Sequence, residues 1–132
     1  MPGHRDILEV ARKRGIKTGL LTNGRTKTQN TKVDLLGIRP LLDCIIISEA
    51  TGYKKPAPEI FQIALEEAGT EAHETWFVGD HPINDVKGAT SVGITGIWMS
   101  GSHEWPADEP PPTFEIDSLD QLELLIDITE RS

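Results

Sequence analysis

The chain has 132 residues, of which 37% are hydrophobic and 26% charged, and its formal net charge is -8 at pH 7. This length suits one domain around a single core, and the composition is that of a folded globular protein rather than a disordered or membrane-spanning one. Thirteen basic against 21 acidic residues leave no Lys/Arg cluster large enough for a nucleic-acid surface. The single cysteine, Cys44, excludes an internal disulfide. No export signal is present and no apolar run approaches the roughly 20 residues of a membrane span, so we expect a cytoplasmic protein with no membrane partner.

The chain opens on a predicted helix over "RDILEVARKRG", with Ile7, Leu8 and Ala11 on its inner face and Gly15 at its end. Short apolar runs follow, and each of them predicts a strand. They are "TGLLT" (18–22), "CIIIS" (44–48), "TWFVG" (75–79) and "ITGIWM" (94–99). The runs are continuous rather than alternating, which is typical of parallel strands covered on both faces.

Helical segments separate these strands. The segment "NTKVDLLG" ends at Gly37, and "PEIFQIALEEAG" has Pro58 in its first turn and Gly69 at its C-terminal end. A further helix is expected to begin near residues 84–85 and to run to about residue 91. The alternation of strand and helix predicts βα units with right-handed crossovers, and therefore an α/β domain of three layers.

The sequence changes character after residue 100. The stretch "GSHEWPADEPPPT" predicts a Pro-rich surface loop at about 101–113, and a PxxP-type ligand is the less favoured alternative. "FEI" then predicts a short edge strand, and a last helix, "LDQLELLIDI", is expected after a cap at Asp117 or Ser118. Its sheet-covering side chains are Leu119, Leu122 and Leu125 or Ile126. No repeat or second domain is evident, so one domain is expected over 1–132.

The tryptophans and histidines are expected to have mainly structural roles or to lie at the surface. Trp76 and Trp98 fall inside predicted strands and are expected in the core, whereas Trp105 of the Pro-rich loop is expected to cover a hydrophobic patch. The histidines are scattered and are expected at the surface rather than as ligands. They are His4, His73, His81 and His103, of which His81 is the candidate for a substrate contact.

Three predicted strand ends carry distinctive residues, and ligands of open parallel sheets collect beyond such carboxyl ends. In "LLTNG", the Thr22 hydroxyl and nearby backbone N–H groups can hold a phosphate or carboxylate oxygen, although an ordinary turn is the favoured reading of this motif alone. In "GYKKPAPEIF", a lysine ahead of a proline and a helix can place an ammonium group near an anion. The alternative is a pair of solvated lysines, the commoner outcome.

The third strand end, "TWFVGDHPIND", has two carboxylates. Gly79 lets the backbone bend, Asp80 emerges at the strand tip, and Asp85 follows about one turn later. Two converging carboxylates repel each other unless a cation lies between them, and hard oxygen ligands fit Mg²⁺. A simple helix N-cap would explain Asp85 but leaves Asp80 without a role.

Taken together, "LLTNG", "KKPAPEIF" and "FVGDHPINDVKGATSVGITGIWM" resemble motifs II, III and IV of the haloacid dehalogenase (HAD) superfamily of hydrolases, mostly phosphatases. The resemblance runs over nearly the whole chain and implies a Rossmann-like HAD core with a mostly parallel sheet. It implies that Thr22 hydrogen-bonds the transferred phosphoryl group, assisted by the backbone N–H groups of Asn23 and Gly24. Lys55, rather than its neighbour Lys54, is implied to neutralise charge on the nucleophile and the phosphoryl oxygens.

The resemblance also implies a metal site. Asp80 would ligate Mg²⁺ directly, and Asp85 would do so directly or through water. Metal and lysine together stabilise the negative charge that spreads over a phosphoryl group during its transfer.

One part of the family pattern is not found. HAD enzymes attack with the first aspartate of an Asp-x-Asp motif at the end of a first, central strand. Neither an apolar strand nor an Asp-x-Asp precedes the helix that begins at about Gly3, and the usual cap is absent too. We therefore expect a core that lacks its central first strand. The inner edges of "TGLLT" and "TWFVG" would then lose on the order of eight backbone hydrogen bonds. Either those edges close on each other, or another segment or a second chain fills the slot, as in a homo-oligomer or by strand exchange.

These observations predict a Mg²⁺-dependent HAD-type hydrolase, a phosphatase of a small phosphorylated metabolite, that is inactive as this chain alone. The alternative is a non-catalytic HAD-like module that binds a phosphorylated ligand or a protein partner. A generic Rossmann-type nucleotide binder is disfavoured, because no Gly-x-Gly-x-x-Gly follows the first strand. The substrate is not predicted, since in this family the cap largely selects it.

Overall fold

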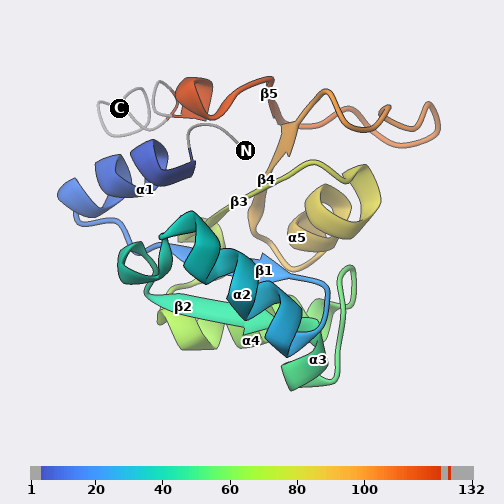
Figure 1. Ribbon diagram of the computed structural model, residues 1–132. Coiled ribbons are helices and arrows are strands. Elements are labelled where there is room, and N and C mark those ends of the chain that lie inside the picture. Colours follow the sequence, from blue (N-terminus) through green and yellow to red (C-terminus); the bar gives the residue numbers. More distant parts are fainter. Residues whose placement is uncertain (1–3, 123–124, 126–132) are drawn as a thin grey trace.

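The computed structural model describes residues 4–122 and residue 125, and its helices and strands alternate along the chain (Figure 1). In chain order they are α1 (His4–Lys13), β1 (Gly19–Thr22), α2 (Thr26–Leu36), η1 (Arg39–Leu41), β2 (Cys44–Ile47), α3 (Ser48–Thr51), α4 (Pro58–Ala68), η2 (Ala72–Glu74), β3 (Trp76–Gly79), η3 (Pro82–Lys87), α5 (Gly88–Ser91), β4 (Thr95–Met99) and β5 (Phe114–Ile116). The predicted strands and the Pro-rich loop are all present. No helix in this part of the chain is long and apolar enough to cross a membrane.

All strand pairings between these elements are parallel, as the continuous apolar runs predict. β1 pairs with β2 from Gly19↔Cys44 to Thr22↔Ile47, and β3 pairs with β4, which pairs in turn with β5. α4 packs on β1 and β2, and α2 lies on the opposite side of these strands in Figure 1. The α/β fold class predicted from the sequence is therefore confirmed.

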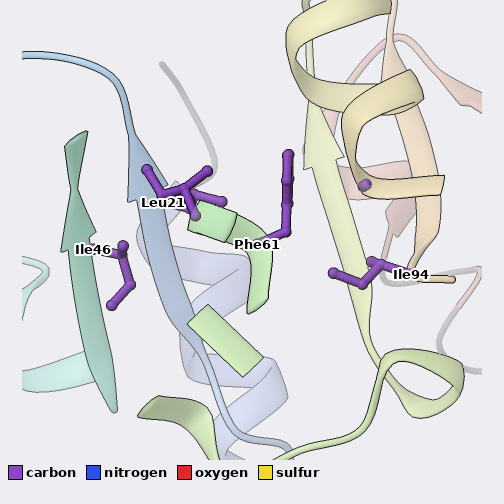
Figure 2. Packing of buried hydrophobic residues seen from close by; sticks show 6 residues of the cluster. Leu21, Ile46, Phe61 and Ile94 are labelled. Carbon is purple, nitrogen blue, oxygen red and sulfur yellow. The ribbon is translucent and has the colours of Figure 1, made fainter. Parts of the chain in front are cut away.

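The strands form two separate sheets, β1–β2 and β3–β4–β5. In Figure 2, β1 and β3 lie on either side of the Phe61 side chain, so these two strands carry the facing edges. Within the described residues neither edge is paired with a further strand, and the two edges are not paired with each other. The central first strand is thus missing, as expected, and direct closure of the two edges is not the outcome.

A hydrophobic cluster with residues from β1, β2, α4 and α5 and from the segment before β4 joins the two sheets. Its buried members are Leu21, Ile46, Ile60, Phe61, Ala89 and Ile94 (Figure 2). Ile60 and Phe61 are fully buried because the helical spacing of "PEIFQIA" turns both toward the strands. A Cβ at Gly88 would lie 2.7 Å from the Phe61 ring, so α5 packs against Phe61 only because it begins with glycine. This cluster compensates in part for the missing ladder between β1 and β3.

A second cluster lies under the C-terminal part of the chain. It consists of Ile97, Met99, Ile116, Leu119 and Leu122, with Ile7 and Leu125 packed against it. Residues 119–122 are helical, and Leu119 and Leu122 are buried, as the sequence predicts for the last helix. Ile126 lies outside the described residues. Through Ile7, α1 also closes onto the β3–β4–β5 sheet.

Helix boundaries agree with the sequence at their ends better than at their starts. Gly37 and Gly69 end α2 and α4 in the left-handed conformation, at φ 67° and 69°. α2 begins at Thr26, four residues before the predicted Asn30, because the polar first turn "TKTQ" carries no apolar periodicity. The short α3, directly after β2, was not predicted at all.

Candidate active site

The predicted site residues lie where β1, β2 and β3 end. β1 ends at Thr22 and β3 ends at Gly79, while β2 leads through α3 to the loop that carries Lys55. Contacts between these segments, described below, bring the three strand ends to one rim of the molecule. This is the rim at which parallel sheets bind ligands.

The turn after β3 is organised by His81. Its Nδ1 accepts hydrogen bonds from the backbone N–H groups of Ile83 (3.2 Å) and Asn84 (3.0 Å), so His81 is the N-cap of η3. A ring nitrogen that accepts hydrogen bonds in this way carries no proton, so Nδ1 is the acceptor nitrogen of the His81 ring in this turn. The helix therefore begins at Pro82, ahead of the expected residues 84–85, and Asp85 is not its cap. His81 is half-buried in this turn rather than a plain surface residue.

Asp85 is buried, and η3 folds it back over the end of β3. Its Oδ1 lies 2.5 Å from Lys55 Nζ, and its Oδ2 accepts a hydrogen bond from the His81 N–H at 3.1 Å. A Cβ at Gly79 would lie 2.4–2.5 Å from the Asp85 side chain. Gly79 is therefore needed for the close approach of this carboxylate, and not only for a bend in the chain.

Lys55 is the lysine that enters the site. Its side chain is 13% exposed and that of Asp85 is 7% exposed, so the two form a buried ion pair. Lys55 Nζ also lies 5.5 Å from the centre of the Phe77 ring on β3. Lys54, by contrast, is exposed. The apolar surroundings strengthen the attraction between the ammonium group and Asp85, because little water is left to screen it.

Asn23 fixes the backbone of Lys55 at both polar groups. Asn23 Oδ1 accepts from the Lys55 N–H at 2.8 Å, and Asn23 Nδ2 donates to the Lys55 carbonyl at 3.2 Å. The sequence predicted a role only for the backbone of Asn23. The side chain thus links the end of β1 to the lysine loop, a contact across 32 residues that no local pattern indicates.

Thr22 is held by Gln29 of α2, a residue that no sequence motif indicated. Thr22 Oγ1 accepts from Gln29 Nε2 at 2.7 Å, while in the part of the chain that the structure describes its own proton has one acceptor, the Asn23 carbonyl at 3.3 Å. The Thr22 hydroxyl therefore keeps a weakly used donor. The Gly24 N–H, expected to be a free donor for phosphate, instead donates to Ser48 Oγ at 2.9 Å.

An open hollow of about 390 Å³ adjoins this end of the rim. It is lined by Gly24, Ser48, Glu49, Gly52, Tyr53 and Lys54. The hollow lies beside the loop that holds Lys55 and offers room for a group larger than a phosphate next to it.

Asp80 is the second predicted metal ligand. It directly follows β3 and its side chain is half-buried. Its backbone carbonyl accepts from Trp98 Nε1 at 3.0 Å, but its carboxylate makes no hydrogen bond or ion pair with any described residue. No group of three or more His, Cys, Asp or Glu side chains forms a metal cage within 4–122 and 125. The Asp80 carboxylate, which has no hydrogen-bond or ion-pair partner among the described residues, belongs to the turn that leads to Asp85, and such hard oxygen donors fit a cation that keeps several waters, as Mg²⁺ does.

We expect Gly79→Ala to disrupt this site. The new methyl group would overlap the Asp85 side chain, so Asp85 must move away from Lys55. Overpacking of this kind costs about 1–3 kcal/mol, and urea denaturation followed by circular dichroism would measure the loss. An unchanged unfolding midpoint, together with an intact Lys55–Asp85 contact in a crystal structure of the variant, would contradict the packing described here.

Comparison with known proteins places the chain in a family. Residues 1–93 match the family model of haloacid dehalogenase-like hydrolases. Because this match covers more than half of the chain, the protein belongs to the haloacid dehalogenase-like hydrolase family. The resemblance that the motifs imply is thereby confirmed.

The relatives include several proteins named as phosphatases. The chain is 32% identical over 127 residues to pyrimidine 5'-nucleotidase YjjG of Escherichia coli, covering 96% of this chain and 56% of that protein. It is 37% identical over 99 residues to glyceraldehyde 3-phosphate phosphatase of Pyrococcus abyssi, covering 75% and 42%. The chain thus spans about half the length of the curated relatives it matches.

Solved structures agree with this assignment. A HAD phosphatase from Thermococcus onnurineus superposes with a TM-score of 0.87 at 32% identity, over 96% of this chain and 57% of that chain. The HAD-hydrolase YfnB from Bacillus subtilis, solved with bound magnesium, gives a TM-score of 0.88 at 28% identity, over 96% and 56%. The shared fold therefore extends over nearly all of this chain.

Proposed function

We propose that this chain provides the phosphate-binding and metal-binding part of a Mg²⁺-dependent phosphatase that acts on a small phosphorylated metabolite. The observation that carries the proposal is the buried Lys55–Asp85 pair at the rim of the strand ends, held by Asn23 on one side and Gly79 on the other. A pair that only stabilised the fold would not need a second carboxylate, Asp80, in the turn that leads to Asp85 and without a partner among the described residues. The phosphatase names of several relatives support the same reaction class.

The residues present suit phosphoryl transfer. Bound Mg²⁺ would neutralise charge on the phosphoryl oxygens, and Asp80 and Asp85 would hold it, Asp85 directly or through water. Lys55 would place its ammonium group against the same oxygens. Thr22, whose hydroxyl is oriented by Gln29, would donate its weakly used proton to the phosphoryl group.

Of the backbone donors, Asn23 and Gly24 are the proposed pair. The Gly24 N–H now donates to Ser48, so it would have to exchange that partner for phosphate. The hollow beside Lys54 would then receive part of the leaving group.

The nucleophile is not among these residues. No Asp-x-Asp occurs anywhere in the 132 residues. In this proposal the attacking aspartate arrives on a strand that pairs with the facing edges of β1 and β3, and a further polypeptide segment outside these 132 residues supplies that strand. Hydrolysis therefore depends on that strand, whereas phosphate and metal binding do not.

The test separates these two requirements. The chain is assayed with Mg²⁺ and a generic aryl phosphate, first alone and then with a synthetic peptide whose apolar strand ends in Asp-x-Asp-x-Thr. We expect negligible turnover alone, turnover with the peptide, and its loss with Lys55→Ala but not with Lys54→Ala. Turnover by the chain alone would overturn the assignment of the nucleophile.

A second candidate is a non-catalytic HAD-like module that binds a phosphorylated ligand or a protein partner. The separate sheets and the lack of an Asp-x-Asp favour it. Phosphate binding that persists, with no turnover after peptide addition at any concentration, would select this candidate over the phosphatase.

A further inference from the structure

The Pro-rich loop, residues 101–113, contacts β4 and η3. β4 pairs with β3, the strand that ends directly before Asp80, and η3 contains Asp85. The Trp105 ring contacts the Trp98 ring of β4 in a tilted arrangement, with ring centres 5.1 Å apart and an interplanar angle of 59°. Glu109 pairs with Lys87 of η3 at 2.7 Å. The His103 ring lies 5.0 Å from the His81 ring. A loop that served only as a connection would not need contacts at these separate points.

Trp98 connects this loop to the site. The residue is buried, and the register of β3 and β4 places it opposite Gly79, directly before Asp80. Its indole N–H donates to the backbone carbonyl of Asp80 at 3.0 Å. Trp98 therefore does more than fill the core, because its one polar atom makes a hydrogen bond to the backbone of Asp80, a predicted metal ligand.

The hydrogen bond from Trp98 fixes one peptide group from one side, and Asp85 fixes it from the other. The carbonyl of the Asp80–His81 peptide accepts from Trp98, and the N–H of the same peptide donates to Asp85 Oδ2 at 3.1 Å. A planar peptide group held at both ends cannot rotate. Its orientation sets the direction of the Asp80 side chain and the position of the Asp85 carboxylate together.

The loop in turn holds Trp98. Trp105 covers the Trp98 ring, and its own indole N–H donates to the Pro110 carbonyl at 3.0 Å, which closes the loop on itself. Near the far end of the loop, Glu109 Oε1 accepts a hydrogen bond from Lys87 Nζ of η3 at 2.7 Å, and the two side chains form an ion pair. The loop is therefore anchored to β4 and to η3 at once.

We propose that Trp98 is a positioning residue that orients Asp80 and Asp85 for a divalent cation, and that the Pro-rich loop keeps it in place through Trp105. The inference rests on the proposed function for the identity of the cation, Mg²⁺. It assigns to residues 101–113, which carry none of the HAD motifs, a defined part in the site. Outer partners that orient metal ligands in this way influence metal affinity almost as strongly as the ligands do.

The test compares two Trp→Phe substitutions in the full chain. Trp98→Phe removes the indole N–H donor and keeps an aromatic ring. Trp76→Phe makes the same change in β3, where the indole makes no hydrogen bond to any described residue. Two quantities are measured by NMR: the hydrogen-exchange rate of the His81 amide without metal, and the Mg²⁺ affinity from a titration of the Asp80 and Asp85 amide signals.

We expect Trp98→Phe to accelerate exchange at His81 by about tenfold, because the peptide group is then held at one end only. We expect Mg²⁺ affinity to fall by about tenfold as well. Trp76→Phe should change the His81 exchange rate and the Mg²⁺ affinity by less than about twofold, since among the described residues the Trp76 indole makes no hydrogen bond to the site. Equal effects of the two substitutions at His81 would overturn the positioning role.

A second pair of variants keeps the test decisive should Trp98→Phe not fold. Glu109→Gln removes the loop anchor on Lys87, and Glu104→Gln makes the same charge change at an exposed position of the loop. Faster His81 exchange in Glu109→Gln alone supports the inference, and equal rates overturn it. A third outcome is possible: His81 exchange is faster in the variants, but the unsubstituted chain shows no response to Mg²⁺. This outcome would support the positioning role of Trp98 and would count against Mg²⁺ as the bound metal.

Discussion

Replacing Lys55 by methionine is expected to lower the free energy of unfolding by about 3 kcal/mol, because removal of one partner leaves the other charge buried and unpaired. Asp85 is the partner left behind, and among the described residues the His81 N–H is then the one remaining donor to its carboxylate. Methionine fills nearly the same volume, so the loss reports the charge rather than a cavity. Urea denaturation followed by circular dichroism measures it.

The sequence offers a matched control at the neighbouring position. Lys54→Met makes the same chemical change on an exposed side chain, and we expect a change within about 0.5 kcal/mol. The double variant Lys55→Met, Asp85→Asn removes both charges and should recover part of the lost stability, since a neutral amide is cheaper to bury than a carboxylate. Equal losses for Lys54→Met and Lys55→Met would contradict the buried ion pair.

Replacing Phe61 by alanine is expected to cost about 4 kcal/mol, in the range of buried aromatic truncations. Phe61 is fully buried, meets the Phe77 ring edge-on at 5.4 Å, and lies in the cluster that joins the two sheets. No ladder connects β1 to β3, so this side chain carries an unusual share of the contact between the two halves. Thermal and urea unfolding of the variant would give the magnitude.

The Phe61 variant has a second expected signature. The three tryptophans, Trp76, Trp98 and Trp105, all belong to the β3–β4–β5 half or to the loop beside it. Their fluorescence therefore reports that half, whereas circular dichroism reports the whole chain. We expect the two transitions to separate in Phe61→Ala and to coincide in Phe114→Ala, which truncates a partly exposed ring at an edge strand. Coincident transitions in both variants would mean that other contacts join the sheets.

Much of the fold was predictable because its determinants are local. Continuous apolar runs indicated each strand, and glycines after periodic segments indicated where α2 and α4 end, since glycine reaches the left-handed conformation without strain. The predicted start of α2 was wrong because the first turn of this helix is polar and shows no apolar periodicity. The short α3 escaped prediction because one turn of helix has no measurable periodicity. The helix expected from residues 84–85 begins earlier, at Pro82, because His81 caps it.

The candidate site divides in the same way. Thr22, Lys55, Asp80 and Asp85 were selected from motifs at strand ends, and the structure brings Lys55 to Asp85, while their roles in catalysis remain predictions. The side-chain link from Asn23 to Lys55, the support of Thr22 by Gln29 and the bond from Trp98 to Asp80 were all missed. These contacts involve side chains whose meeting depends on how the strands are placed.

By itself, the sequence determined which segments form strands and helices, which strand ends carry acids, a lysine and a threonine, and that no Asp-x-Asp accompanies them. Those properties reside in neighbouring residues, where periodicity and backbone preference act. Only the tertiary structure decided that β1 and β3 stay in separate sheets around Phe61, and that His81 rather than Asp85 caps η3. It also decided that one peptide group is held between Trp98 and Asp85. Such outcomes depend on the packing of groups far apart along the chain, because burial and hydrogen bonding are satisfied by the whole molecule and not by any one segment.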